Sequence, residues 1–222
     1  MAGHIDERKL VSGALVIIAI ATLALVIMPY IQLKHIKAPD ALKPYTDVQA
    51  KGRQVYMSLG CVYCHTQQPR DPSFAPADAK RGWGRASTAA DYAYDQVHLL
   101  GTMRTGPDLL NIGARQPSQD WHLGHLYQPR AYTPGSIMPA FPFLFIERKG
   151  PAKPGDVVVN LPPSYAKPGI TIVATTDAVN LVEYMKSLDR TYPIKKTIAE
   201  SLTIDKPNTA KTSADEPAAE TK

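Results

Sequence analysis

Residues 61–65, Cys-Val-Tyr-Cys-His, hold the side chains of this sequence with the clearest capacity for chemistry. They contain both cysteines of the 222-residue chain, and two thiols this close together cannot form a disulfide framework. A Cys-x-x-Cys-His run is the attachment motif for a c-type haem. Cys61 and Cys64 would form thioethers to the porphyrin vinyl groups, and His65 would bind the iron as proximal ligand. The motif therefore predicts one covalently bound haem.

Two other interpretations of the motif are weaker. A thiol–disulfide centre of thioredoxin type would follow a strand, whereas residues 48–59 have helical character and Gly60 ends them. Half of a zinc site would need a second cysteine pair, which the sequence lacks, and the histidines are scattered along the chain. Haem attachment is the favoured interpretation.

The second axial ligand decides whether the iron transfers electrons or reacts with other molecules at an open site. A methionine thioether raises the reduction potential of the haem iron and fills its sixth coordination position. Met138 lies in a proline-rich loop well downstream of the motif and is the favoured ligand. Met103, just before a turn-like Arg-Thr-Gly-Pro segment, is the main alternative. Met57 is too near the attachment site to reach the opposite face, and Met185 fits the apolar face of a helix.

Two histidines and two tryptophans have less certain roles. His122 and His125 are three residues apart on an expected short helix, and either could replace methionine or bind another metal. Polar or interfacial side chains on a surface helix are the more ordinary explanation, and it is favoured. Trp83 and Trp121 could wall the haem or a partner interface, and plain packing explains them equally well.

Helices are the elements expected to position these groups. Four segments have helical character, and most have a capping residue or a stop signal at one end. They are 48–59 (capped by Asp47, ended by Gly60), 91–100, 119–127 (capped by Ser118) and 179–188 (capped by Asp177). The last has an apolar face made of Val179, Leu181, Val182, Met185 and Leu188.

Proline limits regular structure in the rest of the chain. Nine of the 20 prolines fall within residues 129–168, and residues 66–90 also lack a sustained period, so both segments are expected to be loop. Short β-branched runs predict strands at 156–160 and 170–174, as a small hairpin. The predicted fold class is mainly α, with long Pro-rich loops and a possible β-hairpin.

The N-terminal segment from Leu10 to Leu33 contains no charged residue. As a helix it would be roughly 36 Å long, which exceeds the ~30 Å hydrocarbon core of a bilayer. The alternative is a cleaved signal peptide, which has a shorter apolar region and a small-residue cleavage site that this sequence lacks. A single uncleaved transmembrane helix is expected, and Pro29 in its last turns is tolerated there.

Basic residues flank the span equally, so the positive-inside rule does not orient it. Covalent haem attachment is a process of the extracytoplasmic side, which would put the N-terminus in the cytoplasm and the haem domain in the periplasm. The expected organisation is a cytoplasmic N-terminus at 1–9, the transmembrane helix at 10–33, a linker at 34–46, a cytochrome c domain at 47–194 and a flexible tail at 195–222.

Composition excludes several other classes. A length of 222 residues is too short for a large multidomain enzyme, and 44% hydrophobic with 20% charged residues excludes a chain disordered throughout. The net charge of +5 includes no basic run and no basic helix face, so nucleic-acid binding is not supported.

Three segments are similar to class I cytochromes c. Residues 52–67 resemble their haem-binding start, residues 105–109 (Thr-Gly-Pro-Asp-Leu) resemble their Thr-Gly-Pro-Asn-Leu loop, and residues 179–188 resemble their closing helix. The resemblance implies that the carbonyl of Pro107 accepts the ring N–H of His65, a contact that orients the iron ligand. Arg104 and Gly106 are then expected beside this contact.

The wider pattern resembles the mono-haem cytochrome c subunit, subunit II, of cbb-type (C-family) haem-copper oxidases. Besides the membrane anchor, the matching segments are 93–95, 104–109, 121–130 and 136–142. The departure from this pattern is at 147–176, where a more helical connection is expected and this chain has a Pro-rich, strand-like segment.

The resemblance implies a relay function in a bacterial inner membrane. The chain would not be an enzyme by itself. It would take electrons from a multi-haem cytochrome c subunit and pass them to the haem b of the catalytic haem-copper subunit, which reduces oxygen and translocates protons. The alternatives are the small cytochrome c subunit of a nitric oxide reductase and a free-standing, membrane-anchored electron shuttle. A peroxidase with an open iron is more distant.

Overall fold

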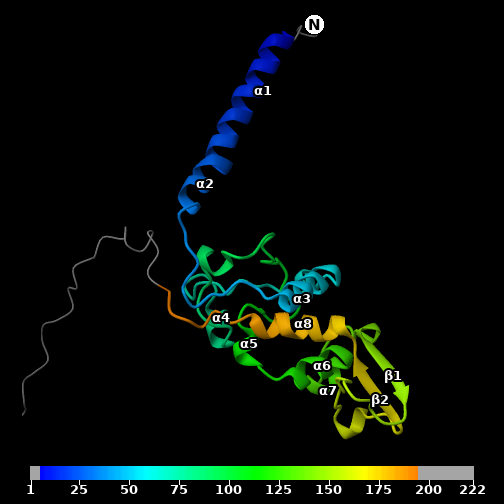
Figure 1. Ribbon diagram of the computed structural model, residues 1–222. Coiled ribbons are helices and arrows are strands. Elements are labelled where there is room, and N and C mark those ends of the chain that lie inside the picture. The colour runs from blue at the N-terminus through cyan, green and yellow to red at the C-terminus, as the bar shows by residue number, and fades with distance from the viewer. Residues whose placement is uncertain (1–5, 195–222) are drawn as a thin grey trace, which may run out of the picture. The chain divides into compact units, whose positions relative to one another are not determined.

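Helices dominate the regular structure of the protein in a computed structural model, which describes residues 6–194 (Figure 1). The predicted mainly α class is therefore correct for this part of the chain. The flexible tail predicted at 195–222 lies outside the described residues.

The N-terminal helix is continuous from Glu7 to Leu33 and, in the described part of the chain, is the one helix long and apolar enough to cross a membrane. It consists of α1 (Glu7–Thr22), a π-helical segment (Leu23–Ile27) and α2 (Met28–Leu33). Pro29 explains the π-helical turns, because it has no N–H to donate and its ring would clash with the carbonyl one turn earlier. A wider turn before the proline accommodates both effects.

Helix α3 (Asp47–Ser58) leads into the Cys-x-x-Cys-His motif. Its N-cap is Thr46, one residue before the predicted Asp47: the hydroxyl of Thr46 accepts from the N–H of Gln49, and the Gln49 side chain accepts from the Thr46 N–H. This reciprocal capping box satisfies two free N–H groups. Gly60 follows the helix with φ of 70°, so the predicted glycine stop is confirmed.

Helix α8 (Thr176–Ser187) packs against α3 (Figure 1). Its N-cap is Thr175 and not the predicted Asp177, because the Thr175 hydroxyl accepts from the N–H of Ala178. The two helices approach so closely at Gly52 that a Cβ there would lie 1.9 Å from the carbonyl oxygen of Asn180. The rigid pair fixes the helix that leads into the motif.

The helix predicted over 91–100 is wrong. Only a 3₁₀ turn forms there, at Ala89–Tyr92, and Val97 adopts a left-handed φ of 65°. The cause is a tertiary contact, since the Arg53 guanidinium donates to the carbonyls of Gln96 and Val97, which a helix would use internally.

Several one- and two-turn helices lie between α3 and α8. The predicted helix at 119–127 is confirmed as α6, with Ser118 as its cap. Residues 66–90 and 129–168, predicted as loop, contain short helical turns, and most of these start at a proline, whose fixed φ and missing N–H suit the first position of a helix. The α-helices are α4 (Pro76–Lys80), α5 (Ile112–Arg115), α6 (Gln119–Tyr127) and α7 (Pro129–Tyr132), and the 3₁₀ turns are Cys61–Tyr63, Ala89–Tyr92, Pro142–Leu144 and Pro163–Tyr165.

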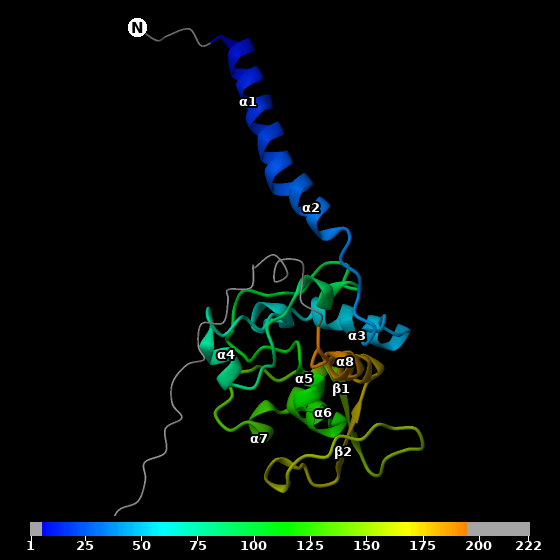
Figure 2. The same cartoon turned by 90° about the vertical axis from the view of Figure 1, so that its left-hand side faces the viewer.

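In the described residues the sheet has two antiparallel strands, β1 (Phe145–Lys149) and β2 (Ile170–Ala174), with Phe145 opposite Ala174 (Figure 2). The predicted strand at 170–174 is confirmed. Its predicted partner, 156–160, is not a strand, but it does pair with β2 through one antiparallel bridge, Val158 to Val173, and two backbone hydrogen bonds. Prolines on both sides of 156–160 keep its pairing short.

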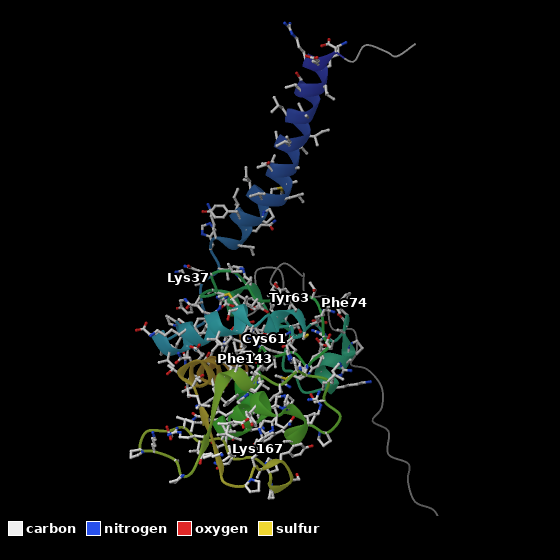
Figure 3. All side chains as sticks on the ribbon, turned by 90° about the vertical axis from the view of Figure 1, so that its right-hand side faces the viewer. Lys37, Cys61, Tyr63, Phe74, Phe143 and Lys167 are labelled. Carbon is white, nitrogen blue, oxygen red and sulfur yellow. The ribbon has the colours of Figure 1, made fainter. Side chains whose placement is uncertain are left out.

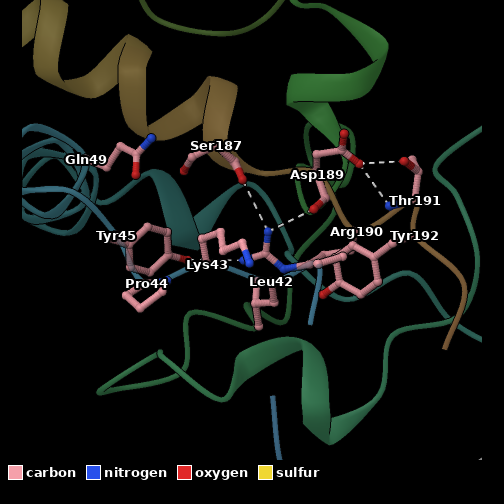
Figure 4. A pocket seen from close by; sticks show the side chains of 11 residues that line it. Leu42, Lys43, Pro44, Tyr45, Gln49, Ser187, Asp189, Arg190, Thr191 and Tyr192 are labelled. Atoms are coloured by element: carbon pink, nitrogen blue, oxygen red, sulfur yellow. Dashed lines mark hydrogen bonds between the residues drawn. The ribbon is translucent and has the colours of Figure 1, made fainter. Parts of the chain in front are cut away.

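The C-terminal end of the described domain is fixed by Arg190, which is 4% exposed. Its guanidinium donates to the backbone carbonyls of Asp91, Ser187 and Asp189. Figure 4 shows this side chain in a pocket between residues 41–49 and 187–192. Arg190 thereby joins the segment after the membrane helix to the end of α8.

Candidate haem-binding site

The Cys-x-x-Cys-His motif forms a compact loop directly after α3. The N–H groups of Cys64 and His65 both donate to the carbonyl of Cys61, at 3.2 and 3.0 Å. Cys64 is exposed and Cys61 is half-buried below Tyr63 (Figure 3). Burial raises the pKa of the Cys61 thiol to about 11, so this thiol is protonated at neutral pH.

The His65 ring is held by the segment that contains Gly106 and Pro107. Its Nδ1 atom lies 2.8 Å from the carbonyl oxygen of Pro107, which leaves Nε2 as the nitrogen for a metal. A Cβ at Gly106 would lie 2.2 Å from Cε1 of the ring, so only glycine fits at this position. Burial lowers the pKa of His65, which favours the neutral imidazole that iron binds.

Asp108 fixes the same segment to the residues that follow the motif. Its carboxylate accepts from the Thr66 hydroxyl at 2.6 Å, the Gln68 N–H at 2.7 Å and the Leu110 N–H at 2.9 Å. The side chain is fully buried, and burial raises its pKa against these hydrogen bonds. Sequence reasoning did not assign Asp108 this role, since only the fold brings 66–68 and 108 together.

Arg104 stabilises the segments that carry the contact between His65 and Pro107. Its guanidinium donates to Asp78 at 2.5 Å, to the Gln68 carbonyl at 2.8 Å and to the Thr66 hydroxyl at 3.1 Å. It also lies over the Trp83 ring, 4.9 Å from the ring centroid. Arg104 therefore joins α4 to the His65 segment, and Trp83, which is buried, has a packing role in this cluster.

Met138 lies in the loop that follows α7. Its side chain is half-buried and packs against the same apolar cluster as Cys61 and Val62. Two hydrogen bonds hold the loop: the Met138 N–H donates to the Ser136 hydroxyl at 3.2 Å, and the Phe141 N–H donates to the Leu126 carbonyl at 2.9 Å.

The other methionines have different surroundings. Met103 is 57% exposed, whereas Met57 and Met185 pack against the core.

The two histidines of α6 also differ from each other. His122 is buried and its Nε2 lies 2.8 Å from the carbonyl oxygen of Gln116, which gives it a structural role. The His125 ring stacks on Trp121, with centroids 4.5 Å apart and planes 8° from parallel. Its Nδ1 atom is buried without a hydrogen-bond partner.

The residues present fit a haem. In the described part of the chain, the buried side-chain atoms without a partner are Arg53 Nε, Tyr56 Oη, Arg115 Nε and His125 Nδ1. Buried polar atoms are normally paired. Arg53 Nε has the Asp95 carboxylate 3.8 Å away, so the other three atoms are the ones consistent with a bound group that supplies partners. Residues 6–194 contain no group of three or more His, Cys, Asp or Glu side chains that would hold a metal ion by themselves, so the zinc alternative has no ligand set there.

The family model described as cytochrome c oxidase, mono-haem subunit/FixO, matches residues 5–157. The chain belongs to this family. The match includes the apolar helix, the Cys-x-x-Cys-His motif, residues 104–109 and Met138, and it ends within the segment 147–176 that was expected to depart from the family pattern. No curated protein matches the chain.

Family membership has direct consequences. The protein is a mono-haem subunit of a cytochrome c oxidase complex, with one haem and a catalytic subunit as partner. Together with the apolar helix Glu7–Leu33, the family supports a membrane anchor. Attachment through Cys61 and Cys64 and ligation by His65 and Met138 stay predictions.

Proposed function

We propose that this chain is the electron-relay subunit of a cbb-type oxidase, with a c-type haem bound covalently beside the surface of its periplasmic domain. The observation that carries the proposal is the rigid His65 ring, oriented by the Pro107 carbonyl directly after two thiols of the attachment motif. Family membership supplies the complex in which such a haem would work.

Each residue of the predicted site would have a separate role in binding the haem. Each thiol of Cys61 and Cys64 would add across one vinyl double bond: the sulfur bonds to one vinyl carbon, the thiol hydrogen moves to the other, and no group leaves. His65 would bind the iron through Nε2, and Met138 would close the opposite position. Arg115, whose guanidinium donates to the Asp108 carbonyl and whose Nε is buried and free, would offer an N–H to a haem carboxylate.

When bound, the haem supplies a one-electron carrier of the His/Met type. The chain's own contribution would be to supply His65 and Met138 as ligands, which would leave oxygen and peroxide no free coordination site on the iron. Cys64 is exposed and Tyr63 beside it is 76% exposed, so the attached ring edge would lie near the protein surface. Electrons would enter from a multi-haem cytochrome c subunit and leave for the haem b of the catalytic subunit.

The proposed topology follows from the attachment chemistry. Thioether formation takes place outside the cytoplasm, so the haem domain would be periplasmic and the N-terminus cytoplasmic, with α1 and α2 crossing a bacterial inner membrane. The helix Glu7–Leu33 has the length and hydropathy for a single crossing.

The function is tested by isolating the protein from membranes in mild detergent and identifying its partners. A copper-containing catalytic subunit and a multi-haem cytochrome c in the same complex are expected. A partner with non-haem iron would instead indicate a nitric oxide reductase, and a protein that stays monomeric would indicate a free electron shuttle.

The ligands are tested with a matched pair of variants. Met138→Ala should abolish the sulfur-to-iron charge-transfer band of the oxidised protein, and Met103→Ala should keep it. The opposite result would assign Met103 as the ligand. Cys61→Ser combined with Cys64→Ser should leave no haem on the denatured chain, whereas haem that remains attached would refute the thioether assignment.

A further inference from the structure

His125 differs from the other histidines described above, because one nitrogen of its ring is buried and unused. Nδ1 has no hydrogen-bond partner, although the ring is fixed against Trp121 by parallel stacking one helical turn away. A buried ring nitrogen without a partner is costly, so its persistence suggests a partner in the haem-loaded protein.

The neighbouring His122 shows that a histidine on α6 need not have a buried ring nitrogen without a partner. Its Nε2 finds the carbonyl of Gln116 at 2.8 Å, in the loop before the helix. His125 lies three residues later on the same helix, and its Nδ1 atom has no such acceptor. The missing partner of His125 is therefore not explained by the packing of α6.

The ring of His125 is uncharged at neutral pH. Burial, and to a lesser extent the rings of His122 and His65, lower its pKa to about 4. A neutral imidazole carries one N–H donor and no charge.

The backbone next to His125 holds the loop of the predicted distal ligand. The carbonyl of Leu126 accepts from the N–H of Phe141, three residues after Met138. Leu126 and Met138 also belong to one apolar cluster. The chain segments that carry His125 and Met138 are thus fixed side by side, and a thioether sulfur is a weak acceptor that suits a neutral donor.

We propose that His125 is a positioning residue of the distal side, and that its Nδ1–H donates a hydrogen bond to the sulfur of Met138 when that sulfur binds the haem iron. The inference rests on the proposed function, because it requires the haem and its His/Met ligation. The donor withdraws electron density from the sulfur and so disfavours the oxidised iron. It also holds the thioether in the orientation that binds.

The test uses the full-length, haem-loaded protein in detergent and compares His125→Phe with His125→Asn. The phenylalanine keeps the ring stack and removes the donor, whereas the asparagine amide keeps an N–H near the position of Nδ1. His125→Phe should shift the electron-exchange equilibrium with a fixed redox partner toward the oxidised protein by about two- to tenfold, as expected for the loss of one hydrogen bond. It should also shift the sulfur-to-iron band, and His125→Asn should restore both towards the wild-type values.

Two further variants make the test specific to Met138. His122→Gln, at the histidine whose bond is structural, should leave the equilibrium and the band unchanged. In a Met138→Ala background, His125→Phe should have no further effect on the equilibrium, because the acceptor is gone. An equal effect in both backgrounds would overturn the proposal, since the donor would then act on another part of the haem.

The remaining outcomes are also decisive. A wild-type protein without a sulfur-to-iron band, in which His125→Phe opens the sixth position, would make His125 the iron ligand and overturn the inference. The proposed function fails separately, when the chain carries no covalent haem. If covalent haem and the band are present and His125→Phe changes neither quantity, only this inference fails.

Discussion

The two sides of the predicted haem crevice differ in how completely the polypeptide organises them. On the proximal side, residues 61–68 and 104–110, the His65 ring, the Asp108 carboxylate and the Arg104 guanidinium all have short hydrogen bonds. On the distal side, α6 and residues 133–141, the Met138 loop is held by one bond to the Ser136 hydroxyl and one backbone bond, and His125 keeps a buried nitrogen unpaired. The predicted proximal ligand is therefore oriented by a side-chain hydrogen bond of its own, whereas the predicted distal ligand is held only through its loop.

The largest expected effect comes from crowding the proximal side. Gly106→Ala would place a methyl group 2.2 Å from the His65 ring and displace it from the Pro107 carbonyl. We expect the yield of haem-loaded protein to fall by roughly tenfold, as severe overpacking implies. The yield is measured from the haem absorbance per mole of chain.

The control is a glycine of the distal loop. Gly135 has φ of 76° and no atom within 4 Å of an added Cβ, so Gly135→Ala costs only local strain of about 1–2 kcal/mol. Its haem yield should stay near wild type. Equal losses in both variants would abolish the contrast between the two sides.

The next effect concerns the buried ion pair behind His65. Asp78→Asn removes the charge that Arg104 contacts, with side chains only 2% and 16% exposed. Breaking a buried pair leaves an uncompensated charge, so the free energy of unfolding should fall by about 3 kcal/mol. Denaturant unfolding measures this value.

A surface pair provides the comparison for Asp78→Asn. Glu183→Gln breaks the half-exposed pair with Lys186 on α8, and its cost should be below about 1 kcal/mol. Similar costs for the two changes would mean that the Arg104–Asp78 pair does not stabilise the proximal side.

A smaller effect is expected in the distal loop. Ser136→Ala removes the acceptor of the Met138 N–H, a bond worth about 1 kcal/mol. Met138 should then leave the iron more often, and added imidazole should bind the oxidised protein about two- to fivefold more tightly. Titration followed by absorbance measures the affinity. Ser58→Ala, at an exposed serine of α3, should leave it unchanged, and a tighter imidazole complex in that control would refute the local explanation.

The smallest expected effect is a pH dependence of stability that comes from His122 in α6. Burial lowers the pKa of His122 below its usual value of about 6.5, so the folded protein keeps this ring neutral while the unfolded chain takes up a proton. The contribution of the neutral ring to the free energy of unfolding is fully present above pH 6.5 and is lost as the pH falls towards the folded-state pKa of His122. His122→Gln should flatten the fall of Tm between pH 6.5 and 5. An unchanged slope would show that another group causes the fall.

Local signals predicted the elements whose determinants lie within a few residues. The Ser118 cap of α6, the glycine after α3 and the strand at 170–174 were all correct. The caps at Thr46 and Thr175 were missed by one or two residues, because adjacent Thr and Asp side chains are both good capping groups. The choice between them depends on backbone angles that the sequence does not display.

The wrong predictions have non-local causes. Residues 91–100 have helical character, but Arg53, more than forty positions earlier, takes the carbonyls of Gln96 and Val97. Strand β1 was missed because its three consecutive charged residues, Glu147 to Lys149, hide the alternation, and because about twenty residues separate it from its partner β2.

The sequence by itself determined the chemistry of the attachment loop, since Cys61, Cys64 and His65 lie within five residues and need no long-range contact to be recognised. It also determined the apolar helix, because length and hydropathy are local properties. Only the tertiary structure decided which groups support His65 and which stay unpaired. Pro107 contacts His65, Asp108 contacts Thr66 and Asp78 contacts Arg104 across 26 or more residues, and the unpaired nitrogen of His125 becomes apparent only when every neighbour is in position. Burial and hydrogen bonding are properties of the assembled chain, so no local pattern contains them.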